Sequence, residues 1–406
     1  MKKRFLSLLL VMSILFLWSC GAPAEEAAEP SPATQSTTAA TDPLTEAPTE
    51  APAQPETEPV TEPPLVLDPG PAVYVNGTAI AGTAIDGDVV YVSAEAFCAA
   101  LGGQTMDGGV STLEYGAVSY TFSPSYSHIM RGERATVLLS PVLNYQNAAY
   151  LPLKELCQML EISVFQDTEQ NTLYCTPSAW PREIPEGYDV PVFMYHAVDN
   201  DLWGISELFV KPERMEEQLK YLSENGYDTI FFEDLYNIDQ YDKPVILTFD
   251  DGYLDNYTNL FPLLQKYNCK ATIFVINQYI GNDVHYTNPD QLLEMANSGL
   301  VSIQSHTVTH PNLDTLDIEE QRHELEQSKL ETCRMTRRES FVLCYPTGRY
   351  DNDTLEIIGD YYHFGIKMNG GLYTTGDSPF EINRYYISRD TSTSSFISIL
   401  EGIFEE

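Results

Sequence analysis

The sequence predicts an α/β protein whose second half consists of repeated strand–helix units. From about residue 185, apolar strand-like runs alternate with amphipathic segments of helical period, and polar residues gather where the strand-like runs end. Such units form a parallel sheet or barrel, with ligand sites at the carboxyl ends of the strands. A self-similar stretch over residues 72–177 predicts a small duplicated α+β domain ahead of them.

The composition excludes several classes of function. The chain has 406 residues and a formal net charge of −37. Because such a polyanion repels phosphate backbones, we expect it to bind no nucleic acid. After the N-terminus, no apolar run is long enough to cross a bilayer, which excludes a channel or a transporter.

Residues 1–20 have the pattern of an export signal. A basic head, Met1–Arg4, precedes the nearly unbroken apolar stretch Phe5–Trp18. The segment Leu17-Trp18-Ser19-Cys20 resembles the lipobox of bacterial lipoproteins, which implies that Cys20 is lipidated and becomes the mature N-terminus. We therefore expect a protein anchored by acyl chains at the outer face of the cytoplasmic membrane, with secretion as the alternative.

Residues 21–71 have the composition of a spacer. They contain 12 of the 26 prolines and ten Asp and Glu residues, but no Lys or Arg. Such a segment cannot bury enough apolar surface to fold, and its prolines and like charges keep it extended. We predict a disordered linker that holds the following domains away from the membrane.

Residues 72–177 contain two copies of one pattern. The segment 90–102 aligns with 149–161 at an offset of 59 residues, and each copy leads from a strand through a short helix into a second strand. With Val75-Asn76-Gly77, the pattern resembles the copper amine oxidase N-terminal-like domain, a stalk module of exported proteins. His128 is its only histidine, so we expect no metal site there and predict a spacer or cell-wall contact.

The second half is expected to contain the following elements in alternation. Strands are predicted at 190–195, 245–249, 271–276, 301–304, 341–345 and 364–367, and helices at 212–225, 257–267, 290–297, 317–334 and 353–361.

Two polar segments at strand ends suggest a metal centre. Asp250 and Asp251 follow the strand 245–249, and adjacent carboxylates repel each other unless a cation lies nearby. An Asp-Asp-Gly turn is also a common helix cap. His306 and His310 follow the strand 301–304, and an aspartate with two histidines is a common set of ligands for a catalytic divalent ion.

Together with His196 and Tyr345 at two further strand ends, these segments resemble the polysaccharide deacetylases of carbohydrate esterase family 4, also called the NodB-homology domain. Residues 248–252 match the first family motif and residues 305–310 the second. The resemblance implies a distorted (β/α)7 barrel over residues 185–406. It also implies removal of N-acetyl groups from an extracellular polysaccharide that contains N-acetylglucosamine, either peptidoglycan or poly-N-acetylglucosamine.

The resemblance also implies roles for individual residues. Asp251, His306 and His310 would hold a divalent metal, for which we expect Zn²⁺, with Co²⁺ or Ni²⁺ as substitutes. Asp250 would be the general base, and the backbone N–H of Tyr345 would stabilise the oxyanion.

The sequence departs from the common family pattern at two places. The third motif reads Cys344-Tyr345-Pro346 where the family commonly has Arg-Pro-Pro, and the C-terminal histidine motif is missing. The variant resembles the subgroup that acts on exported poly-N-acetylglucosamine, which implies that the early His196 is the general acid. Arg384 is a candidate for the missing arginine, and a surface position at a strand start is its alternative.

Two other functions stay open from the sequence. An O-acetyl esterase on xylan or another acetylated glycan would use the same chemistry. A non-catalytic, wall-binding lipoprotein would keep the fold without the catalytic residues. The cysteines besides Cys20 permit disulfides, but we expect burial as small apolar residues. They are Cys98, Cys157, Cys175, Cys269, Cys333 and Cys344.

Overall fold

The computed structural model describes residues 66–404, apart from residues 107, 117, 178–182 and 369. The predicted signal segment 1–20 and the predicted linker up to residue 65 lie outside the described residues. The end of the linker is a correction. Asp68–Pro69 forms β1, which pairs antiparallel with Ile85 and Ala84 of β4. Proline is tolerated there because an edge strand leaves its missing N–H unneeded.

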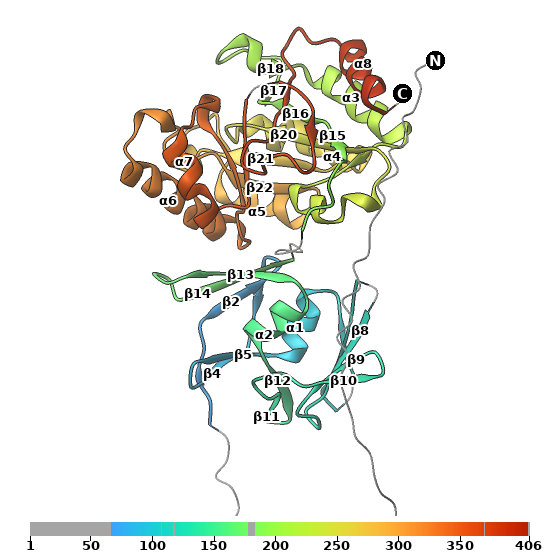
Figure 1. Ribbon diagram of the computed structural model, residues 1–406, viewed down its shortest axis with the longest axis vertical. Helices are drawn as coiled ribbons and strands as arrows, with labels where there is room; N and C mark the ends of the chain where they lie inside the picture. The colour runs from blue at the N-terminus through green and yellow to red at the C-terminus, as the bar shows by residue number, and fades with distance from the viewer. Residues whose placement is uncertain (1–65, 107, 117, 178–182, 369, 405–406) are drawn as a thin grey trace, which may run out of the picture. The chain divides into compact units, whose positions relative to one another are not determined.

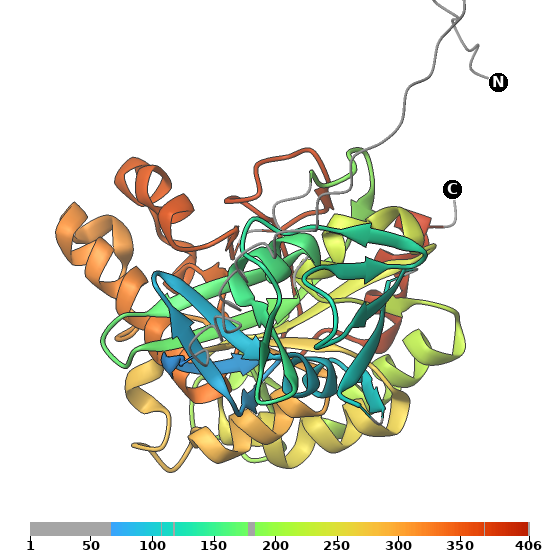
Figure 2. The ribbon, with the colours of Figure 1, turned by 90° about the horizontal axis from the view of Figure 1, so that it is seen from below.

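Residues 66–177 contain two strand–helix pairs. Helices α1 (Ala94–Ala100) and α2 (Leu153–Met159) follow strands β5 (Val89–Ser93) and β12 (Ala148–Pro152), which keeps the offset of 59 residues. Strands β5 and β12 pair with each other in antiparallel register. Both helices lie amid the strands of this part of the chain, which Figure 2 shows from below.

Matching positions of the two helices lie in the hydrophobic core of residues 66–177. Phe97 and Cys98 of α1, and Leu156 and Cys157 of α2, are fully buried. The remaining strands form the rest of three sheets. They are β2 (Ala72–Val75), β3 (Thr78–Ile80), β4 (Thr83–Asp86), β6 (Gln104–Met106), β7 (Val110–Tyr115), β8 (Val118–Phe122), β9 (Ile129–Arg131), β10 (Arg134–Thr136), β11 (Leu143–Tyr145), β13 (Ile162–Asp167) and β14 (Thr172–Pro177).

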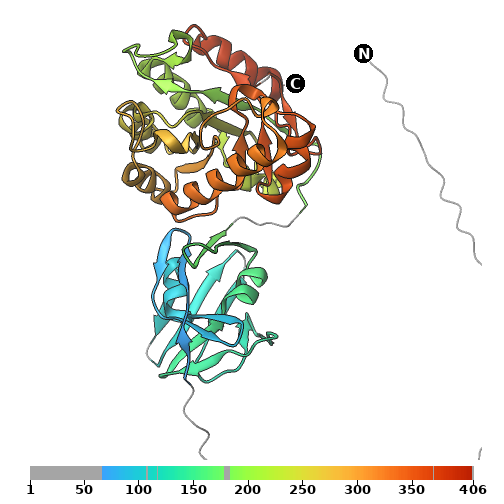
Figure 3. The same ribbon diagram turned by 90° about the vertical axis from the view of Figure 1, so that its left-hand side faces the viewer.

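A curled parallel sheet organises the chain from residue 189 onward. Its strand order is β24-β23-β22-β21-β20-β16-β26, with β19 beside β20, and the pairs are parallel. Every residue of β20 (Pro244–Phe249) and β21 (Ala271–Val275) is buried. Such continuous apolar runs are typical of parallel strands covered on both faces, and Figures 1 and 3 show helices around the strands.

The predicted strands and helices of this domain are present. The strands are β15 (Asp189–Val190), β16 (Val192–Tyr195), β17 (Ala197–Val198), β18 (Phe209–Val210), β19 (Asp228–Thr229), β22 (Val301–Ser305), β23 (Val342–Cys344), β24 (Phe364–Ile366), β25 (Tyr373–Thr374) and β26 (Tyr385–Tyr386). The helices are α3 (Pro212–Glu224), α4 (Phe261–Tyr267), α5 (Pro289–Asn297), α6 (Ile318–Thr336), α7 (Asn352–Ile357) and α8 (Thr393–Phe404).

Three features differ from the sequence prediction. The run 190–195 is divided at Pro191, which has no N–H for a sheet ladder. The helix expected from residue 257 begins as a π-helical turn, Asn256–Leu260, before α4. Helix α8 and the short strands β17, β18, β19, β25 and β26 were not predicted.

The two edges of the sheet lie close to one segment of the chain. Ile382 forms a parallel bridge with Ile366 of β24, whereas Tyr385 and Tyr386 pair with β16. The segment 382–386 therefore reaches from β24 at one edge of the curled parallel sheet to β16 near the other edge. Arg384 lies within this segment.

The cysteines behave as expected. All six after Cys20 are buried and free. Among the described residues, no helix has the length and apolar character needed to span a membrane.

Candidate active site

The turn after β20 presents two aspartates at the carboxyl edge of the sheet. Asp251 has φ 78° and Gly252 has φ 82°, so the chain passes through the left-handed region directly after the strand. A Cβ on Gly252 would lie 2.9 Å from Val275 of β21. Glycine is required at this turn, because both the conformation and the close approach exclude a side chain.

Asp251 lies beside both histidines of the second motif. Its Oδ1 is 3.6 Å from His306 Nε2 and 3.9 Å from His310 Nε2, and the three donor atoms lie within 4.8 Å of one another. Ligands about 2.0–2.1 Å from a tetrahedral zinc lie about 3.4 Å apart. The donor set and its spacing therefore fit a divalent ion, and the three ligands leave room for water or substrate.

His306 is held in the tautomer that a ligand needs. Its Nδ1–H donates to the Cys344 carbonyl at 2.7 Å, which leaves the Nε2 lone pair for a metal. Burial, together with the neighbouring His310, lowers the pKa of His306 to about 4. The ring is therefore neutral at neutral pH.

Helix α6 braces the loop that carries His310. Glu324 accepts hydrogen bonds from the backbone N–H groups of Val308 and Thr309 at 2.8 and 3.0 Å. The loop is in an uncommon conformation, with φ 64° at Thr307 and 60° at His310. Because strained backbone persists only where its surroundings fix it, Glu324 is a structural part of the site.

Asp250 forms a buried ion pair with Arg384. Nη1 and Nη2 of the arginine donate to Oδ1 and Oδ2 at 2.7 and 2.8 Å, and Arg384 is 1% exposed. Burial opposes ionisation of Asp250, but the guanidinium outweighs it and holds the pKa of the carboxyl below its usual range. The sequence left two interpretations of Arg384 open. The structure supports the one in which Arg384 replaces the missing arginine, because it is a buried partner of Asp250 and not a surface residue.

Cys344 explains how an arginine from residue 384 reaches this place. Its Sγ is 3.2 Å from Arg384 Nη2 and 3.6 Å from Asp250 Oδ2. The deacetylases that the sequence resembles commonly have an arginine at the corresponding point of the third motif. Here a small side chain occupies that point, and the space is filled by a guanidinium from the segment that links the sheet edges.

His196 lies on another side of the same carboxylate. Its Nε2 is 3.9 Å from Asp250 Oδ2, and the residue is 8% exposed. Two residues of the turn after Asp251 hold the backbone of His196 and of Val198 just after it. Asn256 Nδ2 donates to the His196 carbonyl at 2.9 Å, and Asp255 accepts from the N–H of Val198 at 2.7 Å. Sequence analysis missed both residues, although they follow the first motif in the chain.

The prediction for Tyr345 is not supported. Its backbone N–H donates to the Ile366 carbonyl at 3.1 Å, as part of the pairing of β23 with β24. Its hydroxyl donates to the Phe380 carbonyl at 2.8 Å, and the side chain is 1% exposed. Neither group is free for an oxyanion, because each already has a partner. The contact to Ile366 depends on strand register, which the motif alone does not show.

Comparisons with known proteins show which family the chain belongs to. A family model described as polysaccharide deacetylase matches residues 237–363. YxkH of Bacillus subtilis, which is assigned to the polysaccharide deacetylases, is 34% identical over 233 residues, covering 56% of this chain and 81% of that protein. The chain belongs to the polysaccharide deacetylase family.

Two other deacetylases are also similar to the chain. The structure of the Streptococcus pyogenes deacetylase PplD in complex with acetate has a TM-score of 0.50 and 28% identity, covering 53% of this chain and 99% of PplD. The poly-β-1,6-N-acetyl-D-glucosamine N-deacetylase of Escherichia coli is 28% identical over 132 residues. That match covers 28% of this chain and only 20% of the E. coli enzyme.

A second cluster in this polysaccharide deacetylase domain could in principle hold a metal. Donor atoms of Asp250, His306 and Cys344 also lie within 4.8 Å of one another. However, Arg384 already occupies both oxygens of Asp250 and contacts the Cys344 sulfur. A cation there would face the guanidinium, so the Asp251 set is the better site.

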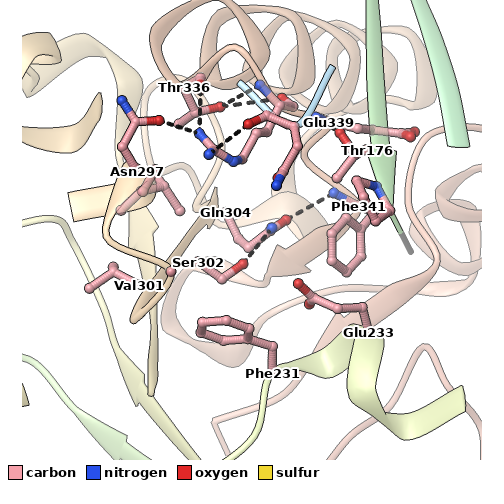
Figure 4. A pocket seen from close by; sticks show the side chains of 16 residues that line it. Thr176, Phe231, Glu233, Asn297, Val301, Ser302, Gln304, Thr336, Glu339 and Phe341 are labelled. Atoms are coloured by element: carbon pink, nitrogen blue, oxygen red, sulfur yellow. Dashed lines mark hydrogen bonds between the residues drawn. The ribbon is translucent and has the colours of Figure 1, made fainter. Parts of the chain in front are cut away.

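A cavity of about 170 Å³ is lined by residues other than these (Figure 4). Its lining includes Phe231, Glu233 and residues 301–304 of β22, in which Gln304 Nε2 donates to Ser302 Oγ at 2.9 Å. Gln304 Oε1 accepts from the Phe341 N–H at 2.9 Å. The catalytic residues follow the carboxyl ends of the strands, so this cavity belongs to the opposite end of the sheet.

Proposed function

We propose that this polysaccharide deacetylase removes N-acetyl groups from an extracellular polymer that contains N-acetylglucosamine, in a metal-dependent reaction. The observation that carries the proposal is the convergence of Asp251, His306 and His310 next to an aspartate held by an arginine. This set provides metal ligands and a separate carboxylate in one place. Peptidoglycan and poly-N-acetylglucosamine are the two substrates considered, and the similarity to the E. coli enzyme favours the second.

Asp251, His306 and His310 would hold the divalent ion, with Zn²⁺ as our first candidate and Co²⁺ or Ni²⁺ as substitutes. When bound, the ion lowers the pKa of water and polarises the acetamide carbonyl. The chain contributes ligands that are already oriented, since the Cys344 carbonyl fixes the His306 tautomer.

Asp250 is proposed as the general base. Its carboxylate is ionised at neutral pH because Arg384 pairs with both oxygens, and ionisation is needed to accept a proton from the attacking water. Arg384 acts through Asp250, as a positioning residue. It orients the carboxylate and keeps its charge.

His196 is proposed as the general acid. Its Nε2 lies 3.9 Å from Asp250 Oδ2, so the two side chains can serve the same acetamide group, the base at the attacking water and the acid at the leaving nitrogen. Amide cleavage expels an amine, which leaves only after it receives a proton. The imidazole is held from its backbone by Asn256 and can donate that proton.

Replacing His196 with Ala is expected to lower hydrolysis of the acetamide by about 10²-fold or more. Hydrolysis of an activated aryl acetate should fall far less, because its leaving group needs little protonation. The measurement is kcat/KM on both substrates, with His323→Ala as the matched control. Equal losses on the amide and the ester would contradict the role of His196.

The substrate is tested by acetate release from four polymers. We would compare poly-N-acetylglucosamine, peptidoglycan, chitooligosaccharides and acetylated xylan, with Asp251→Ala as the inactive control. Release from an N-acetylated glycan supports the proposal and begins to identify the polymer. Release from xylan alone would favour the O-acetyl esterase, and no release from any polymer would favour a wall-binding protein.

For the N-terminal part, we propose a lipid anchor at Cys20 at the outer face of the cytoplasmic membrane, with secretion as the alternative. Support comes from the lipobox-like residues and from the proline-rich composition of residues 21–65. Residues 72–177 would act as a stalk or contact the cell wall. Metabolic labelling with a fatty acid, compared between the wild type and Cys20→Ser, tests the anchor.

A further inference from the structure

Two loops at the catalytic end of the sheet meet through aromatic rings. The first, residues 199–208, follows β17, and the second, residues 276–288, follows β21. Trp203 of the first loop stacks on His285 of the second, with ring centres 4.4 Å apart and an angle of 14°. Tyr253 meets Trp203 edge to face at 4.7 Å and lies 5.0 Å from Tyr286. We call Trp203, Tyr253, His285 and Tyr286 the aromatic wall.

The aromatic wall is continuous with the proposed metal centre. Tyr253 follows Asp251 by two residues, in the same turn after β20. The backbone of the second loop is bound to the same turn, because the Leu254 N–H donates to the His285 carbonyl at 2.7 Å and the Thr287 N–H donates to the Gly252 carbonyl at 3.1 Å. Two backbone hydrogen bonds therefore fix the second loop against the turn that carries Asp251.

Apolar side chains project into solvent at the tips of these two loops. Leu202 is 50% exposed, Ile205 is 69% exposed and Val284 is 81% exposed. They flank the contact between Trp203 and His285, and His285 itself is exposed. Apolar and aromatic groups gathered in this way commonly mark a binding surface, because exposing them gains nothing in stability.

The chemistry of the wall suits an uncharged or cationic sugar. A pyranose ring has a face of C–H groups that packs on a flat aromatic surface, while its hydroxyl groups bond to polar neighbours. The two loops carry the carboxylates of Asp199, Asp201, Glu207 and Asp283 and contain no Lys or Arg. An anionic polymer would be repelled here, whereas a chain of N-acetylglucosamine would not.

We propose that the aromatic wall is a binding subsite for a sugar unit of the substrate polymer next to the unit that is deacetylated, with Trp203 as its anchor. This rests on the proposed function and adds to it. The wall binds the chain through a neighbouring residue, so the enzyme distinguishes polymers from short acetamides. Continuity of the wall with Asp251 is the reason to assign a sugar, rather than another partner, to this surface.

The test compares the dependence of activity on substrate length. Wild-type full-length protein, Trp203→Ala, Trp203→Phe and the control Tyr188→Ala are assayed on β-1,6-linked N-acetylglucosamine oligomers of two to six units and on an aryl acetate. Tyr188 is a matched aromatic, 37% exposed, that precedes β15 at the other end of the sheet. Binding of the hexamer to each protein is measured by calorimetry in the Asp250→Asn background.

For Trp203→Ala we expect the gain in kcat/KM from dimer to hexamer to fall about tenfold, which corresponds to about 1.4 kcal/mol. Hexamer affinity should weaken similarly, whereas hydrolysis of the aryl acetate should change no more than about twofold, because it does not reach the subsite. Trp203→Phe should keep most of the gain, and Tyr188→Ala should match the wild type.

Two outcomes would overturn the subsite. One is an unchanged length dependence and hexamer affinity in Trp203→Ala. The other is sedimentation of the protein with phosphatidylcholine vesicles that is lost in Trp203→Ala while hexamer affinity is kept, which would assign the surface to lipid. If the wild type releases acetate from no glycan, the proposed function itself is contradicted. If the hexamer affinity still depends on Trp203 in that case, the subsite is supported independently of the activity.

Discussion

Replacing Asp250 with Asn should lower acetate release by about 10²–10⁴-fold. The amide has nearly the same shape as the carboxylate but cannot accept the proton of the attacking water. Because Asp251, His306 and His310 are unchanged, the variant should still bind one metal ion. The measurement is kcat on an N-acetylglucosamine oligomer, together with metal content by atomic emission.

The control for this substitution is Asp353→Asn, at an exposed position near the start of α7. It removes the same charge far from the site and should leave kcat unchanged. Full activity of Asp250→Asn with normal metal content would remove Asp250 as the base. Loss of metal along with activity would instead place Asp250 among the ligands.

Replacing Arg384 with Met should have the second large effect, on stability as well as on activity. The change leaves the Asp250 carboxylate buried without its partner, which costs about 3–5 kcal/mol. Turnover should also fall, because the base loses its orientation. The measurements are chemical denaturation and kcat, with Arg322→Met, a partly exposed arginine paired with Asp360, as the control.

The direction of the pH dependence distinguishes the loss of the ion pair from a general loss of stability. In the wild type, Arg384 holds the pKa of Asp250 below its unfolded value of about 3.9, so the ionised pair contributes stability above that pH and loses it as the pH falls. Without Arg384, burial raises the pKa instead. Arg384→Met should then be less destabilised at pH 5 than at pH 8, and the acid limb of its kcat/KM profile should move to higher pH.

A double variant sharpens the test. Arg384→Met combined with Asp250→Asn removes both charges, so part of the lost stability should return. If the double variant is destabilised by the sum of the two single variants, the two side chains are not coupled and the ion pair does not hold the base.

The sequence predicted those parts of the site that lie within short motifs. Asp250 and Asp251 follow an apolar strand directly, and His306 and His310 are four residues apart. The position at the strand end and the spacing of the ligands could therefore be predicted from the sequence. The strand–helix alternation was visible for the same reason, since buried parallel strands have continuous apolar runs.

The rest of the site depends on contacts between distant segments. Arg384 reaches Asp250 across 134 residues, and only the path of the chain between β24 and β26 brings it there. The Tyr345 N–H is used by Ile366 because of strand register, which a motif does not encode. Asn256 supports His196 from a π-helical turn that the helical pattern could not distinguish from an α-helix.

The most direct test of the account is a metal titration of acetate release. Metal-free protein is titrated with Zn²⁺ while it acts on a β-1,6-linked N-acetylglucosamine oligomer, in parallel with Asp251→Ala. We expect no activity without metal, a linear rise that ends at one equivalent, and no rise for Asp251→Ala because one of three ligands is missing. Undiminished acetate release by chelator-treated protein, or equal activation of Asp251→Ala, would contradict a metal centre at Asp251, His306 and His310.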